Sequence, residues 1–219
     1  MKQELYLIGT IDFDLQGPQR LEKWLHRLKP DQVTIDMDQE RVNEIENTRL
    51  LSIFPHGLEN LYQRLKKSCT DLHPGTAKKM LRNIGYDYHH AATYCALPGR
   101  ELILTTHQNV GKSNTFMDTS SRYSRKELEI KLAKSPPELQ QEVENIYQGA
   151  WPELENESQT VAFMKSRDFS AEQTIRKCSG KVVHVGGLRH IFWDEYPNLY
   201  QRLRNLNPTR IKLNEADQL

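Results

Sequence analysis

Several residues that could do chemistry follow or end apolar runs that are typical of buried strands. Asp12 follows LYLIG, Asp36 ends the run QVTID, and His190 follows VHVGG. In open parallel sheets, binding sites form at the carboxyl ends of the strands, so we expect these three side chains to converge. The imidazole of His190 could bind a metal or move a proton near neutral pH, although a histidine near a helix start is more often structural. Asp12 is open to two interpretations, as a cap of the following helix or as part of a site.

A second acidic residue follows the same strand as Asp36. Asp36 and Asp38 are two residues apart, so they share a face if the strand continues through them. Alternatively, Asp38 caps the next helix and Arg41 is a solvated side chain. Capping suits Asp36 less well, because Asp36 lies inside the apolar run.

Arg167 and Asp168 lie near the apolar stripe of a helix predicted at about 158–178. Buried charges are costly unless they are paired. These charged residues therefore either form a salt bridge with a partner side chain, or Arg167 points into a polar pocket.

Residues 107–114, HQNVGKSN, resemble a phosphate-binding loop, but Thr106 stands where the leading glycine is needed. No aspartate-x-x-glycine or asparagine-lysine-x-aspartate motif follows. These residues are better interpreted as part of a polar loop at 107–121.

Strand and helix signals alternate at both ends of the chain, and the middle is mostly helical. The opening strand–helix–strand pattern predicts parallel pairing through a right-handed crossover. We therefore predict an α/β fold with a mostly parallel central sheet from the N- and C-terminal parts, in one domain over 1–219 with helical insertions at about 54–98 and 120–150. The expected strands are ELYLIG (4–9), QVTIDM (32–37), ELILTT (101–106), KVVHVGG (181–187) and TRIKL (209–213).

Composition narrows the class of protein. The 219 residues carry a formal net charge of +1, so no overall charge attracts the chain to nucleic acid. No apolar stretch approaches the length of a membrane helix, and the N-terminus does not have the pattern of a signal peptide. Three widely spaced cysteines, Cys69, Cys95 and Cys178, suit reduced thiols. These features predict a cytoplasmic protein.

Five segments together resemble the TraB/PrgY–Tiki superfamily. Gly9-Thr10-Ile11-Asp12 resembles its first G-T-x-H, and 29–41, KPDQVTIDMDQER, resembles its K-P-D-x-V-x-x-E-L-D-x-x-R. Residues 167–171, RDFSA, resemble an R-D-x-x-M-A helix, and 187–190, GLRH, match the second G-x-x-H. The helix–strand segment 86–104 is also similar. The order and spacing of these pieces cover most of the chain.

This resemblance implies an EreA/ChaN-like fold, similar to that of ChaN haem-binding proteins and erythromycin esterases. In the Tiki branch, the two G-x-x-H histidines and an acidic residue are thought to hold a divalent metal for peptide-bond hydrolysis. TraB-type relatives are linked to the inactivation of peptide pheromones. In this chain Asp12 replaces the first histidine and Asp36 replaces the glutamate, whereas Arg41, Arg167 and His190 match the pattern.

With these replacements, Asp12, Asp36 and His190 still offer two carboxylates and one imidazole. Such a set suits a divalent metal such as Mn²⁺, Fe²⁺, Zn²⁺ or Co²⁺, which could activate water. The expected catalytic residues are Arg167 and His190. Arg167 would stabilise the negative charge that develops during the reaction. The expected ligand-binding residues are Gly9, Asp38, Arg41 and Gly187. However, aspartate is shorter than both residues that it replaces, and the acidic position expected after ELILTT is occupied by Thr105, Thr106 and His107.

Two hypotheses follow for the function. The first is a metal-dependent hydrolase that acts on a small-molecule, peptide or amide-like substrate. We expect such a protein to bind neither nucleic acid nor membrane. The second is a catalytically degenerate protein of the same fold that binds a small anion. A structural interpretation, in which the helical middle serves a partner or a homodimer, is also open.

Overall fold

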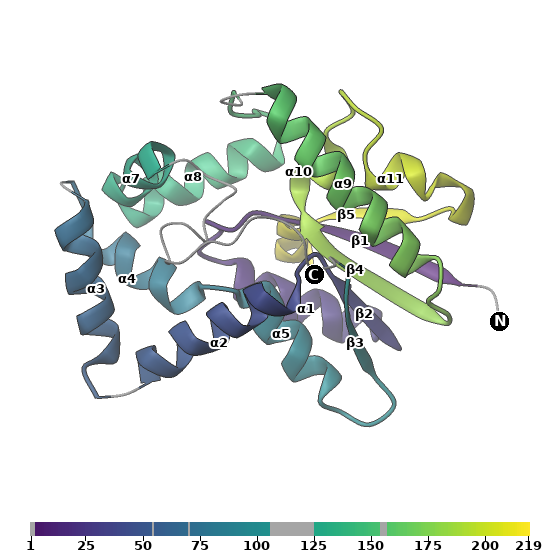
Figure 1. The fold of residues 1–219 in the computed structure, drawn as a ribbon, viewed down its shortest axis with the longest axis horizontal. Helices are drawn as coiled ribbons and strands as arrows, with labels where there is room; N and C mark the ends of the chain where they lie inside the picture. The colour runs from purple at the N-terminus through teal and green to yellow at the C-terminus, as the bar shows by residue number, and fades with distance from the viewer. Residues whose placement is uncertain (1–2, 54, 70, 106–124, 154–156) are drawn as a thin grey trace.

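The structure is a computed structural model that describes residues 3–53, 55–69, 71–105, 125–153 and 157–219. Its centre is a five-stranded sheet in which every pair of neighbours is parallel, in the order β3-β2-β4-β1-β5 (Figure 1). The strands are β1 (Glu4–Thr10), β2 (Gln32–Ile35), β3 (Glu101–Leu104), β4 (Lys181–Gly187) and β5 (Thr209–Lys212). The predicted α/β fold with a parallel sheet is confirmed.

The register of the sheet brings the carboxyl ends of its three central strands to one edge. Thr10 of β1 is opposite Gly187 of β4, and Ile35 of β2 is opposite Val185. The strand predicted at 32–37 ends at Ile35, but the Asp36 amide still donates to the Val185 carbonyl at 3.1 Å. Asp36 and the residues that follow β1 and β4 therefore leave the sheet side by side.

The two faces of the sheet have separate helical covers, as the alternation of side chains along the strands requires. On one face Leu7 and Val182 pack with α9 (Glu157–Ile175), α10 (Leu188–Phe192) and α11 (Leu199–Arg202). On the other, Ile8 and Val183 belong to a larger apolar cluster. That cluster includes α1 (Gly17–Leu28), α5 (Tyr86–Cys95) and the short C-terminal helix η2 (Leu213–Gln218). A 3-10 turn, η1 (Arg204–Leu206), leads into β5.

Most of the remaining helices lie beyond the carboxyl end of β1, on the side of the molecule away from the N-terminus (Figure 1). They fall largely where helical insertions were predicted. The last two of them are separated at Ser135, whose side chain forms a capping box with Glu138. These helices are α2 (Gln39–Ile53), α3 (Gly57–Ser68), α4 (Pro74–Asn83), α7 (Arg125–Ala133) and α8 (Pro136–Tyr147). The segment HQNVGKSN and the polar loop predicted at 107–121 lie outside the described residues.

Within the described ranges, no helix has both the length and the apolar character needed to cross a membrane.

Candidate functional site

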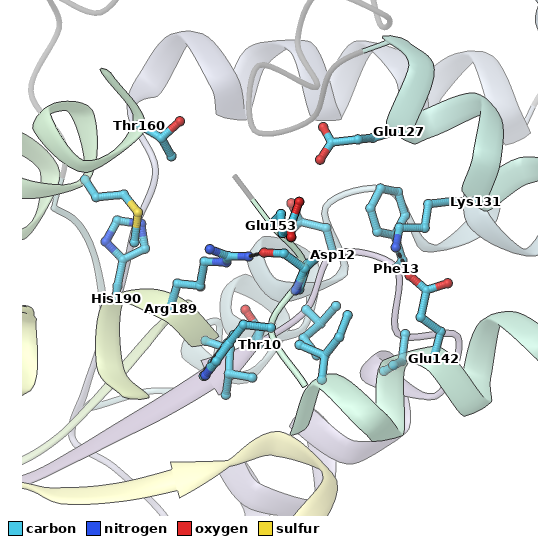
Figure 2. Close-up of a pocket in the computed structure, with 18 of the residues that line it drawn as sticks. Thr10, Asp12, Phe13, Glu127, Lys131, Glu142, Glu153, Thr160, Arg189 and His190 are labelled. Carbon is cyan, nitrogen blue, oxygen red and sulfur yellow. Dashed lines mark hydrogen bonds and ion pairs between the residues drawn. The ribbon is translucent and has the colours of Figure 1, made fainter. Parts of the chain in front are cut away.

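A cavity of about 450 Å³ opens where the sheet ends meet the helical middle. One side carries His190 and Thr160, and the opposite side carries Glu127, Lys131 and Phe13 (Figure 2). Apolar side chains of α8 and α9 form much of the wall, with charged groups among them. A cavity of this size and mixed lining is typical of a small-molecule or peptide site.

His190 is held by a buried carboxylate on α9. Its Nδ1 lies 2.5 Å from Asp168 Oδ1, and the Tyr196 hydroxyl donates to Asp168 Oδ2 at 2.8 Å. Because a carboxylate only accepts hydrogen bonds, Nδ1 donates its proton to Asp168, and Nε2 is the nitrogen that faces away from this carboxylate. Burial, followed by the charge of Asp168, raises the pKa of Tyr196, which keeps its hydroxyl a donor. This arrangement fixes the tautomer and the orientation of an imidazole that lines the cavity.

Local sequence explains why this trio assembles. β4 ends in Gly187, and α10 begins directly at Leu188, so His190 is placed one turn after the end of a central strand. Met164, Trp193 and Tyr196 form a small apolar cluster, and the Asn198 amide donates to the Trp193 carbonyl at 2.9 Å. These contacts hold the Tyr196 segment beside α9.

Asp36 and Arg167 form a second pair beside His190. Arg167 Nε donates to Asp36 Oδ1 at 3.0 Å, and Nη2 donates to the Asp36 carbonyl at 2.5 Å. The other carboxylate oxygen, Oδ2, lies 3.9 Å from His190 Nε2. Arg167 also lines the cavity. Both earlier interpretations of Arg167 are therefore present in one side chain, which is ion-paired and also reaches a polar pocket.

His184 lies beneath this group on β4. It is fully buried, and its Nδ1 is 3.0 Å from Thr34 Oγ1 on the neighbouring strand. Burial lowers the pKa of His184 to about 4, although Asp36 acts in the opposite direction. At neutral pH this ring is uncharged and supports the site from within the sheet.

Asp12 is exposed in the turn after β1, and it lines the cavity. It does not cap α1, which begins at Gly17; Asp14 is the carboxylate that accepts from the Gln16 amide, at 2.9 Å. Figure 2 shows the Asp12 and Arg189 side chains pointing toward one another, with His190 lying to one side. The question left open by the sequence is answered in part: Asp12 belongs to the cavity wall.

The residues expected to bind ligand divide into two groups. Gly187 lines the cavity. Asp38 Oδ1 accepts from the Arg41 amide at 2.7 Å and so caps α2, which is the capping alternative. The Arg41 side chain lies 3.5 Å from Glu44, and Gly9 is packed under α10. Among the described residues that line the cavity, neither Gly9, Asp38 nor Arg41 is present, so their ligand-binding role stays a prediction.

The donors expected to hold a metal do not fit one as they are placed. Asp36 Oδ1 is engaged by Arg167, and Asp36 is not among the described residues that line the cavity where Asp12 lies. In the part of the chain that the structure describes, no group of three histidine, cysteine or acidic residues is arranged to hold a metal ion. The divalent metal therefore stays a prediction from the resemblance.

Two supporting residues, His184 and Tyr196, were not predicted from the sequence. A histidine inside the apolar run KVVHVGG was the available signal for His184, because a buried strand rarely includes an ionisable side chain without a partner. Tyr196 follows a short helix in an irregular segment, and no local pattern connects it to Asp168, 28 residues earlier. Thr105, where an acidic residue was expected, is buried and donates to the Ile35 carbonyl at 3.1 Å.

Comparisons of the chain with protein-family models, with curated proteins and with solved structures find no match.

Proposed function

We propose that this protein is a hydrolase of peptide or amide-like substrates, with His190 as the base that activates water. The observation that carries the proposal is the Asp168–His190 pair, at 2.5 Å, whose imidazole lines the cavity. The resemblance of 187–190 and 167–171 to TraB-like segments supports the same reaction class. The cavity is large enough for a short peptide segment, and its apolar walls suit side chains.

In the proposed reaction, water attacks the substrate carbonyl carbon while His190 Nε2 takes a proton from it. Asp168 stabilises the imidazolium that forms. Arg167, which lines the cavity, would stabilise the negative charge that develops on the former carbonyl oxygen. The imidazolium then gives its proton to the leaving nitrogen as the C–N bond breaks, so that a carboxylic acid and an amine are released.

The test is turnover of a panel of fluorogenic peptidyl amides by wild type and by His190→Ala. We expect His190→Ala to lower kcat by at least about 100-fold, because general base catalysis contributes about that much. The matched control is His26→Ala, since the His26 side chain is 67% exposed on α1. Equal rates for wild type and His190→Ala would contradict the proposal.

A chelator arm of the same assay addresses the metal. Because Asp12, Asp36 and His190 are not assembled as a ligand set, we expect turnover to survive removal of divalent ions. Activity lost with chelator and restored by Mn²⁺, Fe²⁺, Zn²⁺ or Co²⁺ would instead favour the metal-dependent reaction implied by the resemblance.

The second candidate is a binding protein without turnover. The observation that favours it is the engagement of Arg167 by both the side chain and the carbonyl of Asp36, which offsets the charge that the reaction needs. This candidate predicts that some panel peptides raise Tm in a saturable way without being cleaved. Cleavage that depends on His190 would exclude it.

A further inference from the structure

A second cavity, of about 300 Å³, lies away from the site above, among α2, α4, α5 and the start of α1. The charged side chains of its lining are all basic. Arg49 and Arg82 contribute two guanidinium groups, and His89 and His90 contribute two imidazoles. No aspartate or glutamate is found among the described residues that line it. The first cavity, in contrast, has charged groups of both signs.

The guanidinium and imidazole groups are placed at different depths. Arg49 and Arg82 are exposed, whereas His89 and His90 are partly buried. Apolar and aromatic side chains, including Ile84 and the buried Tyr86, complete the walls. The cavity thus combines a cationic opening with an apolar interior.

Arg49 is held in place by His89. Arg49 Nη1 lies 2.9 Å from His89 Nδ1, and because a guanidinium only donates, Nδ1 must be the acceptor. His89 is therefore neutral with its proton on Nε2, a buried atom that has no acceptor among the described residues. Burial, followed by the charge of Arg49, lowers the pKa of His89 to about 4, in agreement with a neutral ring. A fixed guanidinium loses less side-chain freedom when it binds an anion.

The neutral polar groups of the lining are already used within the chain. Thr48 and Ser52 donate to the carbonyls of Glu44 and Arg49, and the Asn83 amide donates to the Leu15 carbonyl. Arg82 and His90, by comparison, have no hydrogen bond or ion pair with any residue that the structure describes. The guanidinium groups of Arg49 and Arg82 are therefore the charged donors that the lining offers to a ligand.

We propose that this second cavity binds a small organic phosphate monoester. Guanidinium groups match the oxygen geometry of a phosphate and hold it through charge-assisted hydrogen bonds. The aromatic and apolar walls formed by Tyr86 and Ile84 would contact the organic part. The volume exceeds what an inorganic ion needs, which is why the class is an organic monoester. The inference does not depend on the hydrolase proposal, because the two cavities have no lining residue in common.

The test is calorimetric titration of the 219-residue chain with phenyl phosphate, with inorganic phosphate and benzoate as separate arms. We expect saturable binding of phenyl phosphate that is at least about tenfold tighter than binding of either inorganic phosphate or benzoate. Removing one charged hydrogen-bond donor should weaken binding by about tenfold or more, so Arg82→Gln is the principal variant. Arg49→Gln is the second, and the matched control is Arg64→Gln on α3, an exposed arginine outside both cavities.

The outcomes separate cleanly. Loss of affinity in Arg82→Gln and Arg49→Gln, with Arg64→Gln unchanged, supports the site. The proposal is overturned if phenyl phosphate does not bind saturably, if Arg64→Gln weakens binding as much as Arg82→Gln, or if benzoate or inorganic phosphate binds equally well. His190→Ala should bind phenyl phosphate as wild type does, so failure of the hydrolase proposal and failure of this one are distinguishable.

Discussion

After His190, Asp168 is the residue that matters most for the proposed reaction. In Asp168→Asn the amide nitrogen can donate to Nδ1, which favours the wrong tautomer of His190. We expect kcat to fall by about 10²–10⁴-fold with little change in Tm. Tyr196→Phe removes one hydrogen bond to the same carboxylate, worth about 1 kcal/mol, so kcat should fall only about fivefold. Steady-state kinetics check both, and ¹⁵N NMR of the His190 ring reports the tautomer; an unchanged tautomer in Asp168→Asn would contradict this role.

His184 should make the folded state sensitive to acid. Its pKa is lowered from 6.5 to about 4 by burial, so between these values the unfolded chain binds more protons than the folded chain. Stability from this group is therefore complete above pH 6.5 and is lost as the pH falls toward 4. The expected loss is about 2–3 kcal/mol between pH 7 and 4.5. Urea unfolding of wild type and His184→Gln checks this: the variant should lose less over that range, and parallel curves would argue against it.

At the scale of elements, the close approach of α10 to β1 decides where His190 lies. A Cβ added at Gly9 would come within 2.6 Å of Leu188 Cδ1 and 3.2 Å of Leu188 Cα. We expect Gly9→Ala to displace α10, to lower the free energy of unfolding by about 1–3 kcal/mol and to reduce kcat as well. Urea unfolding of Gly9→Ala, Leu188→Ala and the double variant measures the coupling. Strictly additive losses would mean that this contact does not limit the packing.

The elements themselves could largely be predicted from the sequence, but the predicted pairing of the first two strands was wrong. These strands are parallel in one sheet, and β4 lies between β1 and β2. Apolar runs identified all five strands of the described part of the chain, because those signals are local. The helix predicted at 158–178 ends at Ile175, three residues earlier, and such ends depend on packing. Arg167 meets Asp36 across 131 residues, and the packing of α9 on the sheet brings them together. Local patterns therefore placed Asp36 and His190 at one edge of the sheet but did not show that Arg167 and Asp168 would bind them.

At the scale of the whole molecule, one buried arginine joins segments from distant parts of the chain. Arg20 of α1 is 2% exposed, and its guanidinium contacts three carboxylates: Asp14 at 2.9 Å, Glu144 of α8 at 2.6 Å, and Asp217 of η2. These carboxylates raise the pKa of Arg20 despite its burial. The Tyr147 hydroxyl also donates to Asp14, at 3.2 Å. The N-terminal turn, the helical middle and the C-terminus thus meet at one cation.

Removing this cation should destabilise the whole fold. In Arg20→Met the fully buried Asp14 carboxylate loses its principal charged partner, and breaking a buried pair in this way costs about 3–5 kcal/mol. Urea unfolding of Arg20→Met checks this, with Arg27→Met, an exposed arginine of the same helix, as the matched control. A loss below about 1 kcal/mol would show that the network contributes little. Asp14→Asn in the Arg20→Met background should recover part of the loss, because the cost comes from the uncompensated carboxylate rather than from missing arginine packing.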